Sequence, residues 1–147
     1  MNTLIEKMAE NSKIVNIINE FLDHKDIYEV GKKVTVIEPM DEYWRELVCL
    51  FLAAVVYYLK ETHTSKDELC YYAVLDFINK AWRMNIEELT ALFLDKGRKS
   101  EAYKCYSALL DMAGTTVLSV LIAAHTKIKG IYYDKQRIAE FERVFEV

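Results

Sequence analysis

The fold of this chain is decided by residues 44–59, which read WRELVCLFLAAVVYYL. A helix through this stretch places Val48, Phe51 and Val55 on one side, while further Leu, Ala and Val side chains cover much of the other. A helix that is apolar nearly all round is enclosed by other helices. The apolar run is too short to span a bilayer, which takes about 20 residues. We therefore expect this segment to be the central core helix of an all-α domain.

Outside this segment, capping signals divide the sequence into further helices. A Ser, Thr, Asn or Asp side chain at a helix start accepts hydrogen bonds from the first turn, and a Glu three residues later completes a capping box. Glycine favours the left-handed conformation that ends many helices. The predicted boxes are Thr3 with Glu6, Ser65 with Glu68 and Asn85 with Glu88, the further starts are Asp41, Ser100 and Asp134, and the predicted ends or bends are Gly97, Gly114 and Gly130.

These signals predict a compact bundle of about six to seven helices around the central helix. Residues 4–22 carry an amphipathic stripe that includes Leu4, Met8 and Ile18. Residues 31–39 contain the sequence VTVI, which suits a short strand, but no other segment offers a partner strand. We therefore expect residues 31–39 to form an ordered loop.

The composition fits one cytoplasmic domain over residues 1–147. Apolar residues make up 52% of the chain, which has only four Gly and one Pro. A chain of 147 residues usually forms a single core. Its net charge of −4 argues against a protein that mainly coats nucleic acid. Cys49, Cys70 and Cys105 are too far apart for a zinc motif and are expected to be reduced, buried thiols. The N-terminus does not have the pattern of a signal peptide.

The residue types that carry chemistry form no recognisable catalytic or metal-binding motif. His24, His63 and His125 lack the spacing of a helical zinc site. We expect His63 to be a solvated or capping residue and His125 a core residue bonded to a carbonyl. The sequence has no Walker loop, dinucleotide turn or nucleophile elbow. We therefore expect no catalysis, no metal and no cofactor; a small enzyme with an unrecognised helical site is the alternative.

Two groups of surface residues are candidates for binding a partner. Tyrosines are adjacent at 57–58, 71–72 and 132–133, so each pair is expected to place one ring in the core and one at the edge. Outward rings would form a partner-binding patch. The densest positive cluster would contact DNA phosphates or an acidic protein segment, or form a solvated loop. Its residues are Lys96, Arg98, Lys99 and Lys104.

Two segments go beyond a generic helical pattern. Residues 40–59 have an Asp-Glu-Tyr-Trp start before the long apolar helix, and residues 102–122 have a Tyr-rich helix followed by Ala-Gly-Thr-Thr-x-x-Ser. Both resemble the all-α domain of type IV secretion coupling proteins, the VirD4/TraG family, with Glu42 and Tyr43 in place of Pro and Phe and Thr115 in place of Lys. The residues that keep the family pattern are Asp41, Trp44, Tyr106, Gly114, Thr116 and Ser119.

We expect the residues of this pattern to have structural rather than chemical roles. We expect Trp44 to anchor the first turn of the central helix in the core, Gly114 to allow close helix approach, and Thr116 and Ser119 to bond back to preceding carbonyls.

The resemblance covers residues 40–128 and implies a non-catalytic recognition domain. In the family this domain is inserted in a membrane-anchored ATPase, so the full-length protein would be an ATPase at the cytoplasmic face of the membrane. The domain would dock a relaxase or relaxosome accessory protein, and single- or double-stranded DNA, without touching the membrane itself. The alternative is a free-standing helical regulator or scaffold of a mobile element or phage.

Overall fold

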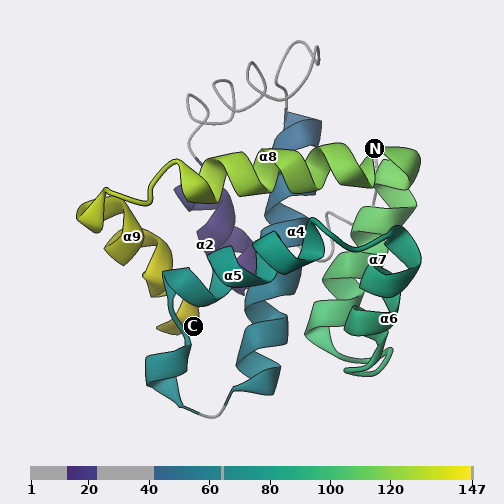
Figure 1. The fold of residues 1–147 in the computed structure, drawn as a ribbon, viewed down its shortest axis with the longest axis horizontal. Helices are drawn as coiled ribbons and strands as arrows, with labels where there is room; N and C mark the ends of the chain where they lie inside the picture. The colour runs from purple at the N-terminus through teal and green to yellow at the C-terminus, as the bar shows by residue number, and fades with distance from the viewer. Residues whose placement is uncertain (1–12, 23–41, 64, 147) are drawn as a thin grey trace.

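The computed structural model describes residues 13–22, 42–63 and 65–146, and within them the chain is all-α without strands (Figure 1). This confirms the predicted helical bundle. The α-helices are α2 (Lys13–Phe21), α4 (Glu42–Thr62), α5 (Tyr71–Ala81), α6 (Ile86–Leu94), α7 (Glu101–Ala113), α8 (Val117–Lys129) and α9 (Lys135–Glu142). The 3-10 turns are η1 (Lys66–Glu68), η2 (Gly114–Thr116) and η3 (Arg143–Glu146).

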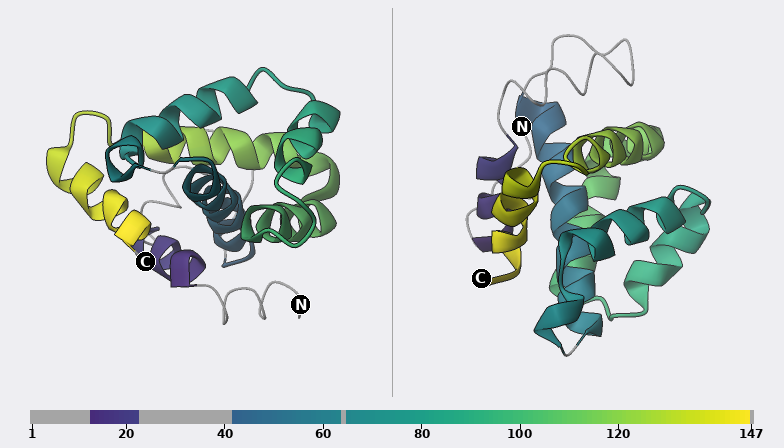
Figure 2. Two further views of the ribbon diagram at one scale, coloured as in Figure 1. Left: turned by 90° about the horizontal axis from the view of Figure 1, so that it is seen from below. Right: turned by 60° about the vertical axis from the view of Figure 1, so that its left-hand side comes forward.

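Helix α4 is the central element, as its composition predicts. Every side chain from 47 to 56 is buried. Helix α7 packs along α4 most extensively, and α2, α8 and α5 contact its other sides. Figure 2 shows α4 between α7 on one side and the pair α2 and α9 on the other. A helix that is apolar all round is thus enclosed by four neighbours.

The C-terminal part of the chain closes the core beside α2. The ring of Phe141 in α9 packs edge-on against Phe21 of α2, with centroids 5.1 Å apart. Lys60 Nζ at the end of α4 donates to the carbonyl of Phe145, at 3.0 Å. These contacts hold α9 against α2 and hold η3 against α4, on the side of α4 that is opposite α7.

Local capping fixes several helix boundaries where the sequence predicts them. Asn85 Oδ1 accepts from the amide of Glu88, which returns a carboxylate to the Asn85 amide, completing a capping box for α6. Ser100 caps α7 and Asp134 caps α9 through the same kind of bond. Gly97 ends the α6 region with φ +94°, as expected for a glycine in this place.

The predicted capping box of Ser65 and Glu68 is wrong. These residues belong to the turn around η1, and α5 begins only at Tyr71. The Tyr71 amide instead donates to the Glu142 carboxylate in α9, at 2.7 Å. A side chain 71 residues further along the chain thus provides the cap that a local residue was expected to supply.

Gly114 bends the chain between α7 and α8. It has φ +53° and ψ −122°, a combination that L-residues avoid. A Cβ atom at this position would meet nothing within 4 Å, so the expectation that Gly114 allows close helix approach is wrong. The glycine is required by the backbone conformation, which turns α8 across the end of α7 (Figure 1).

The bend at Gly114 lies inside the one described segment that is long and apolar enough to cross a membrane. Within residues 13–22, 42–63 and 65–146, this segment is Glu101–Lys129, judged by length and composition alone. Its two helices meet at Gly114 and both pack against α4. Core helices of soluble proteins satisfy the same criterion.

The predictions for Thr3 and Glu6, His24, residues 31–39 and Asp41 lie outside the described residues.

Candidate functional site

The predicted basic cluster lies in the loop between α6 and α7 and at the start of α7. Lys96 Nζ lies 5.1 Å above the centre of the Tyr58 ring, and Lys104 Nζ is 3.5 Å from Glu101 Oε1. Arg98 and Lys99 are exposed. The structure therefore divides the cluster into two cations with partners inside the chain and two that project into solvent.

Two of the residues that carry the family resemblance, Trp44 and Tyr106, lie in the core, whereas Gly114 and Thr116 are exposed at the helix bend. Trp44 is 4% exposed, and Tyr106 is fully buried with its hydroxyl 2.7 Å from Thr90 Oγ1. Burial raises the pKa of Tyr106. Thr116 Oγ1 donates to the Ala113 carbonyl at 2.7 Å, as expected, and Ser119 is half-buried. Trp44 and Tyr106 therefore belong to the core, and the hydroxyl of Thr116 stabilises the helix bend.

The three tyrosine pairs behave differently from one another. Tyr71 is buried and Tyr72 is 53% exposed, which confirms the expected division for that pair. The expectation is wrong for the other two: both rings at 57–58 are half-buried and both at 132–133 are exposed. Residues 132–133 follow the end of α8, so helical geometry no longer alternates their directions.

Exposed apolar side chains gather on the antiparallel pair α5 and α8, where Tyr72, Trp82, Leu118 and Tyr132 lie. The Tyr71 hydroxyl near the start of α5 donates to the Ile128 carbonyl near the end of α8, at 2.6 Å. Outward residues recur along both helices at spacings of three and four. We call this surface the α5–α8 face; it consists of Tyr72, Leu75, Asn79 and Trp82 from α5 and Leu118, Ile122, His125, Lys129 and Tyr132 from α8 and the turn that follows.

Contacts between the two helices make the α5–α8 face continuous. At one end, the rings of Tyr72 and Tyr132 meet edge to face with centroids 6.0 Å apart. Near the middle, His125 Nε2 lies 3.0 Å from Asn79 Oδ1. The same imidazole packs against Trp82, with ring centroids 4.6 Å apart. Side chains of the two helices therefore meet at several points between Tyr132 and Trp82.

The Trp82 end of the face is hollowed. A shallow pocket of about 170 Å³ is lined by Trp82, Leu118, Leu121 and Ile122. Trp82 is 47% exposed and Leu118 is 57% exposed, although both are large apolar side chains. Apolar groups grouped around a depression mark interaction sites more often than single exposed side chains do.

The charges on the face are positive or neutral. Partial burial lowers the pKa of His125, and the nearby Lys129 lowers it further, so the environment favours the neutral imidazole. Lys129 is exposed at the end of α8, and Arg83 is exposed directly after Trp82. None of the residues that form the face carries a carboxylate.

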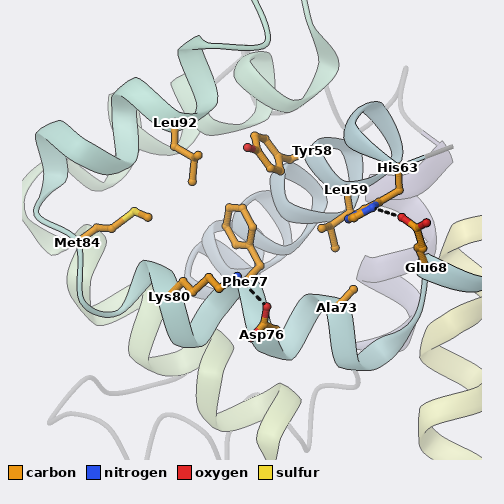
Figure 3. Close-up of a pocket in the computed structure, with 10 residues that line it drawn as sticks. All are labelled: Tyr58, Leu59, His63, Glu68, Ala73, Asp76, Phe77, Lys80, Met84 and Leu92. Carbon is orange, nitrogen blue, oxygen red and sulfur yellow. Dashed lines mark hydrogen bonds and ion pairs between the residues drawn. The ribbon is translucent and has the colours of Figure 1, made fainter. Parts of the chain in front are cut away.

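A larger pocket of about 390 Å³ lies between α4, α5 and α6 (Figure 3). His63 Nδ1 is 2.5 Å from Glu68 Oε2 on one side, and Lys80 Nζ is 3.1 Å from Asp76 Oδ2 on the other. His63 directly follows α4 and is half-buried and paired with Glu68. Because these polar groups at the rim are paired with each other, the pocket suits an apolar group better than an ion. The apolar walls are Tyr58, Leu59, Ala73, Phe77, Met84 and Leu92.

The cysteines and the other titratable groups do not converge on a reactive site in the described part of the chain. Burial raises the pKa of Cys105 to about 12 and that of Cys49 further still. The Cys49 thiol donates to the Val15 carbonyl at 3.1 Å, whereas Cys70 is only half-buried. Among the described residues, no three His, Cys, Asp or Glu side chains gather as metal ligands would.

Patterns in the sequence indicate the α5–α8 face only weakly. Leu118, Leu121, Ile122 and Ile128 follow one helical apolar pattern, which does not by itself separate core from surface. In the structure Leu121 and Ile128 are buried, whereas Leu118 is exposed and Ile122 half-exposed. The signal in the sequence is the width of the apolar stripe on α8, which is wider than a helix needs for packing on one side.

No protein-family model, curated protein or solved structure matches this chain.

Proposed function

We propose that this chain is a non-catalytic recognition domain that receives another protein on the α5–α8 face. The observation that carries this proposal is the exposure of Trp82 and Leu118 around a pocket on an otherwise well-packed molecule. Covering the exposed parts of these two side chains would remove roughly 200 Å² from water, a gross gain of about 5 kcal/mol before the cost of association. Tryptophan is also among the residues that most often dominate binding energy.

The resemblance to type IV secretion coupling proteins supports a specific class of partner. One of its two segments builds α4, and the other builds α7, the bend at Gly114 and the first part of α8. These elements position Leu118 and Ile122 on the α5–α8 face. The partner in this proposal is a relaxase or a relaxosome accessory protein, and the domain acts at the cytoplasmic face of the membrane. DNA is a further candidate ligand for Arg98 and Lys99.

Isothermal titration calorimetry against the relaxase and accessory proteins encoded in the same genome tests this function. We expect binding that Trp82→Ala weakens by about 30-fold, the effect of a typical hot spot of about 2 kcal/mol. The substitution Leu118→Asp, which places a charge in the pocket, should have a similar effect. The control is Lys13→Glu, since Lys13 is exposed on α2, which lies on another side of α4.

Two results would contradict the proposal at different levels. If relaxosome proteins bind but the Trp82 and Leu118 variants bind equally well, the α5–α8 face is not the docking surface. If none of them binds, the coupling-protein assignment fails, and a free-standing helical regulator or scaffold describes the chain better. A natural reading frame that continues on both sides into a Walker-containing ATPase would favour the coupling-protein assignment.

A further inference from the structure

The α5–α8 face has the dimensions and pattern of a surface that receives a helix. Helix α8 has 13 residues, which corresponds to a length of about 20 Å. Its outward residues lie beside those of α5, so the surface consists of two rows of side chains, one from each helix. An amphipathic helix docks on such a surface with residues at spacings of three, four and seven.

The chemistry along the face differs between its middle and its ends. The hollow beside Trp82 and Leu118 accepts an apolar side chain, and Tyr72 and Tyr132 offer ring surfaces at the other end. Asn79 and His125 are hydrogen-bonded to each other between these ends. The middle of the face therefore makes no demand for a charged partner.

The positive charges at the two ends select the sign of the partner. Lys129 is exposed beside the tyrosine end, and Arg83 is exposed beside the tryptophan end. No ion pair within the described residues is formed by either side chain, and no carboxylate belongs to the face. A partner with Lys or Arg at its flanks would meet like charge, whereas Asp or Glu would be attracted.

We propose that the α5–α8 face binds an acidic amphipathic helix of another protein. Its apolar residues cover the Trp82 hollow and the tyrosine rings, while its carboxylates lie near Arg83 and Lys129. This inference rests on the proposed docking function and adds the chemistry of the partner segment. A second copy of the chain and a membrane surface are the competing occupants.

Selection from a phage-displayed library of random 16-residue peptides tests the chemistry without any relaxosome component. The full chain is the target, and the double variant Trp82→Ala, Leu118→Ala, which removes the apolar groups without adding charge, is used for counter-selection. We expect enriched peptides with apolar residues at helical spacing and an excess of Asp and Glu. Enrichment of basic or uncharged peptides, or no enrichment beyond that on the double variant, would overturn the proposal.

The affinity of the best synthetic peptide then locates the contacts. Trp82 should dominate acrylamide quenching, because Trp44, the only other tryptophan in the sequence, is 4% exposed. We expect bound peptide to protect Trp82 from quenching, and Trp82→Ala to weaken binding about 30-fold when anisotropy of a labelled peptide is measured. Lys129→Glu and Arg83→Glu should each weaken it about two- to five-fold, more at low salt. Lys13→Glu is the matched charge control; an effect equal to that of Lys129→Glu would refute site-specific pairing.

The competing occupants give different readouts. Protection of Trp82 by phosphatidylglycerol vesicles but not by the selected peptides would assign the face to a membrane. Dimerisation in sedimentation experiments that the double variant abolishes would assign it to a second copy. Either result overturns the acidic helix. If relaxosome proteins bind through Trp82 while no acidic peptide is selected, the docking function stands and only the partner chemistry is wrong.

Discussion

Replacing Gly114 with alanine is expected to destabilise the fold by about 1–3 kcal/mol. The cost is a backbone cost. Gly114 has φ +53° and ψ −122°, where an L-residue is strained, while a Cβ atom would meet nothing within 4 Å. Alanine would instead favour continuation of α7 as a straight helix, since it has the highest helix propensity. Packing of both α7 and α8 on α4 opposes that rearrangement.

Urea unfolding followed by circular dichroism at 222 nm measures this cost. A loss of about 2 kcal/mol with a slope of about 2 kcal/mol per molar corresponds to a midpoint lowered by about 1 M. Thr115→Ala is the matched control, because Thr115 is exposed, follows Gly114 directly and has no positive φ. Its effect should stay within about 0.5 kcal/mol.

Two results would refute this reasoning about the bend. An unchanged midpoint for Gly114→Ala would mean that the backbone at position 114 readily accepts an L-residue. A loss above about 4 kcal/mol would point to a steric clash or a lost core contact, because backbone strain at one residue costs less. The second result would restore the original expectation that Gly114 permits close helix approach.

Further substitutions test the cap, a buried hydroxyl and the basic loop. Glu142→Ala removes the acceptor for the Tyr71 amide and should cost about 1 kcal/mol in urea unfolding, whereas Glu142→Gln should cost less because it retains an acceptor. Burial raises the pKa of Tyr71 to about 12, and its hydroxyl donates to Ile128. The neutral phenol is therefore favoured by the folded state, and stability should fall above pH ~10, by up to about 1.4 kcal/mol per pH unit from this group, until the folded-state pKa is reached. Tyr71→Phe should make that decline shallower; an identical pH profile would contradict the assignment. If the basic loop binds DNA, charge reversal at Arg98 and Lys99 should weaken binding and lower the salt slope by roughly 1.4 for a single strand. Affinity that does not vary with salt would remove the loop as a DNA site.

Local signals in the sequence predicted much of the fold correctly. The apolar run at 44–59 identified the central helix because a segment without a polar side must be enclosed. Asn85, Ser100 and Asp134 identified helix starts because each satisfies amides within three residues of itself. Such effects depend on neighbours in the chain and so can be recognised from the sequence.

The candidate docking surface could not be predicted in the same way. A helical apolar pattern reports that Leu118 and Leu121 are both hydrophobic, but not how many of the sides of α8 are covered by other helices. The structure buries Leu121 and leaves Leu118 and Trp82 around a hollow. The sequence also placed Lys96 and Arg98 in one basic cluster, whereas in the structure Lys96 packs over the ring of Tyr58 on another helix and Arg98 is exposed.

The sequence by itself determined the helical class, the central position of α4 and the caps whose donors and acceptors lie within a few residues. Only the tertiary structure decided where α5 begins, because its cap is Glu142, far along the chain. It also decided which apolar side chains remain outside the core. The physical reason is that capping and periodicity act over one or two turns, whereas burial depends on which helices meet in space, and here the bend at Gly114 brings α8 beside α5.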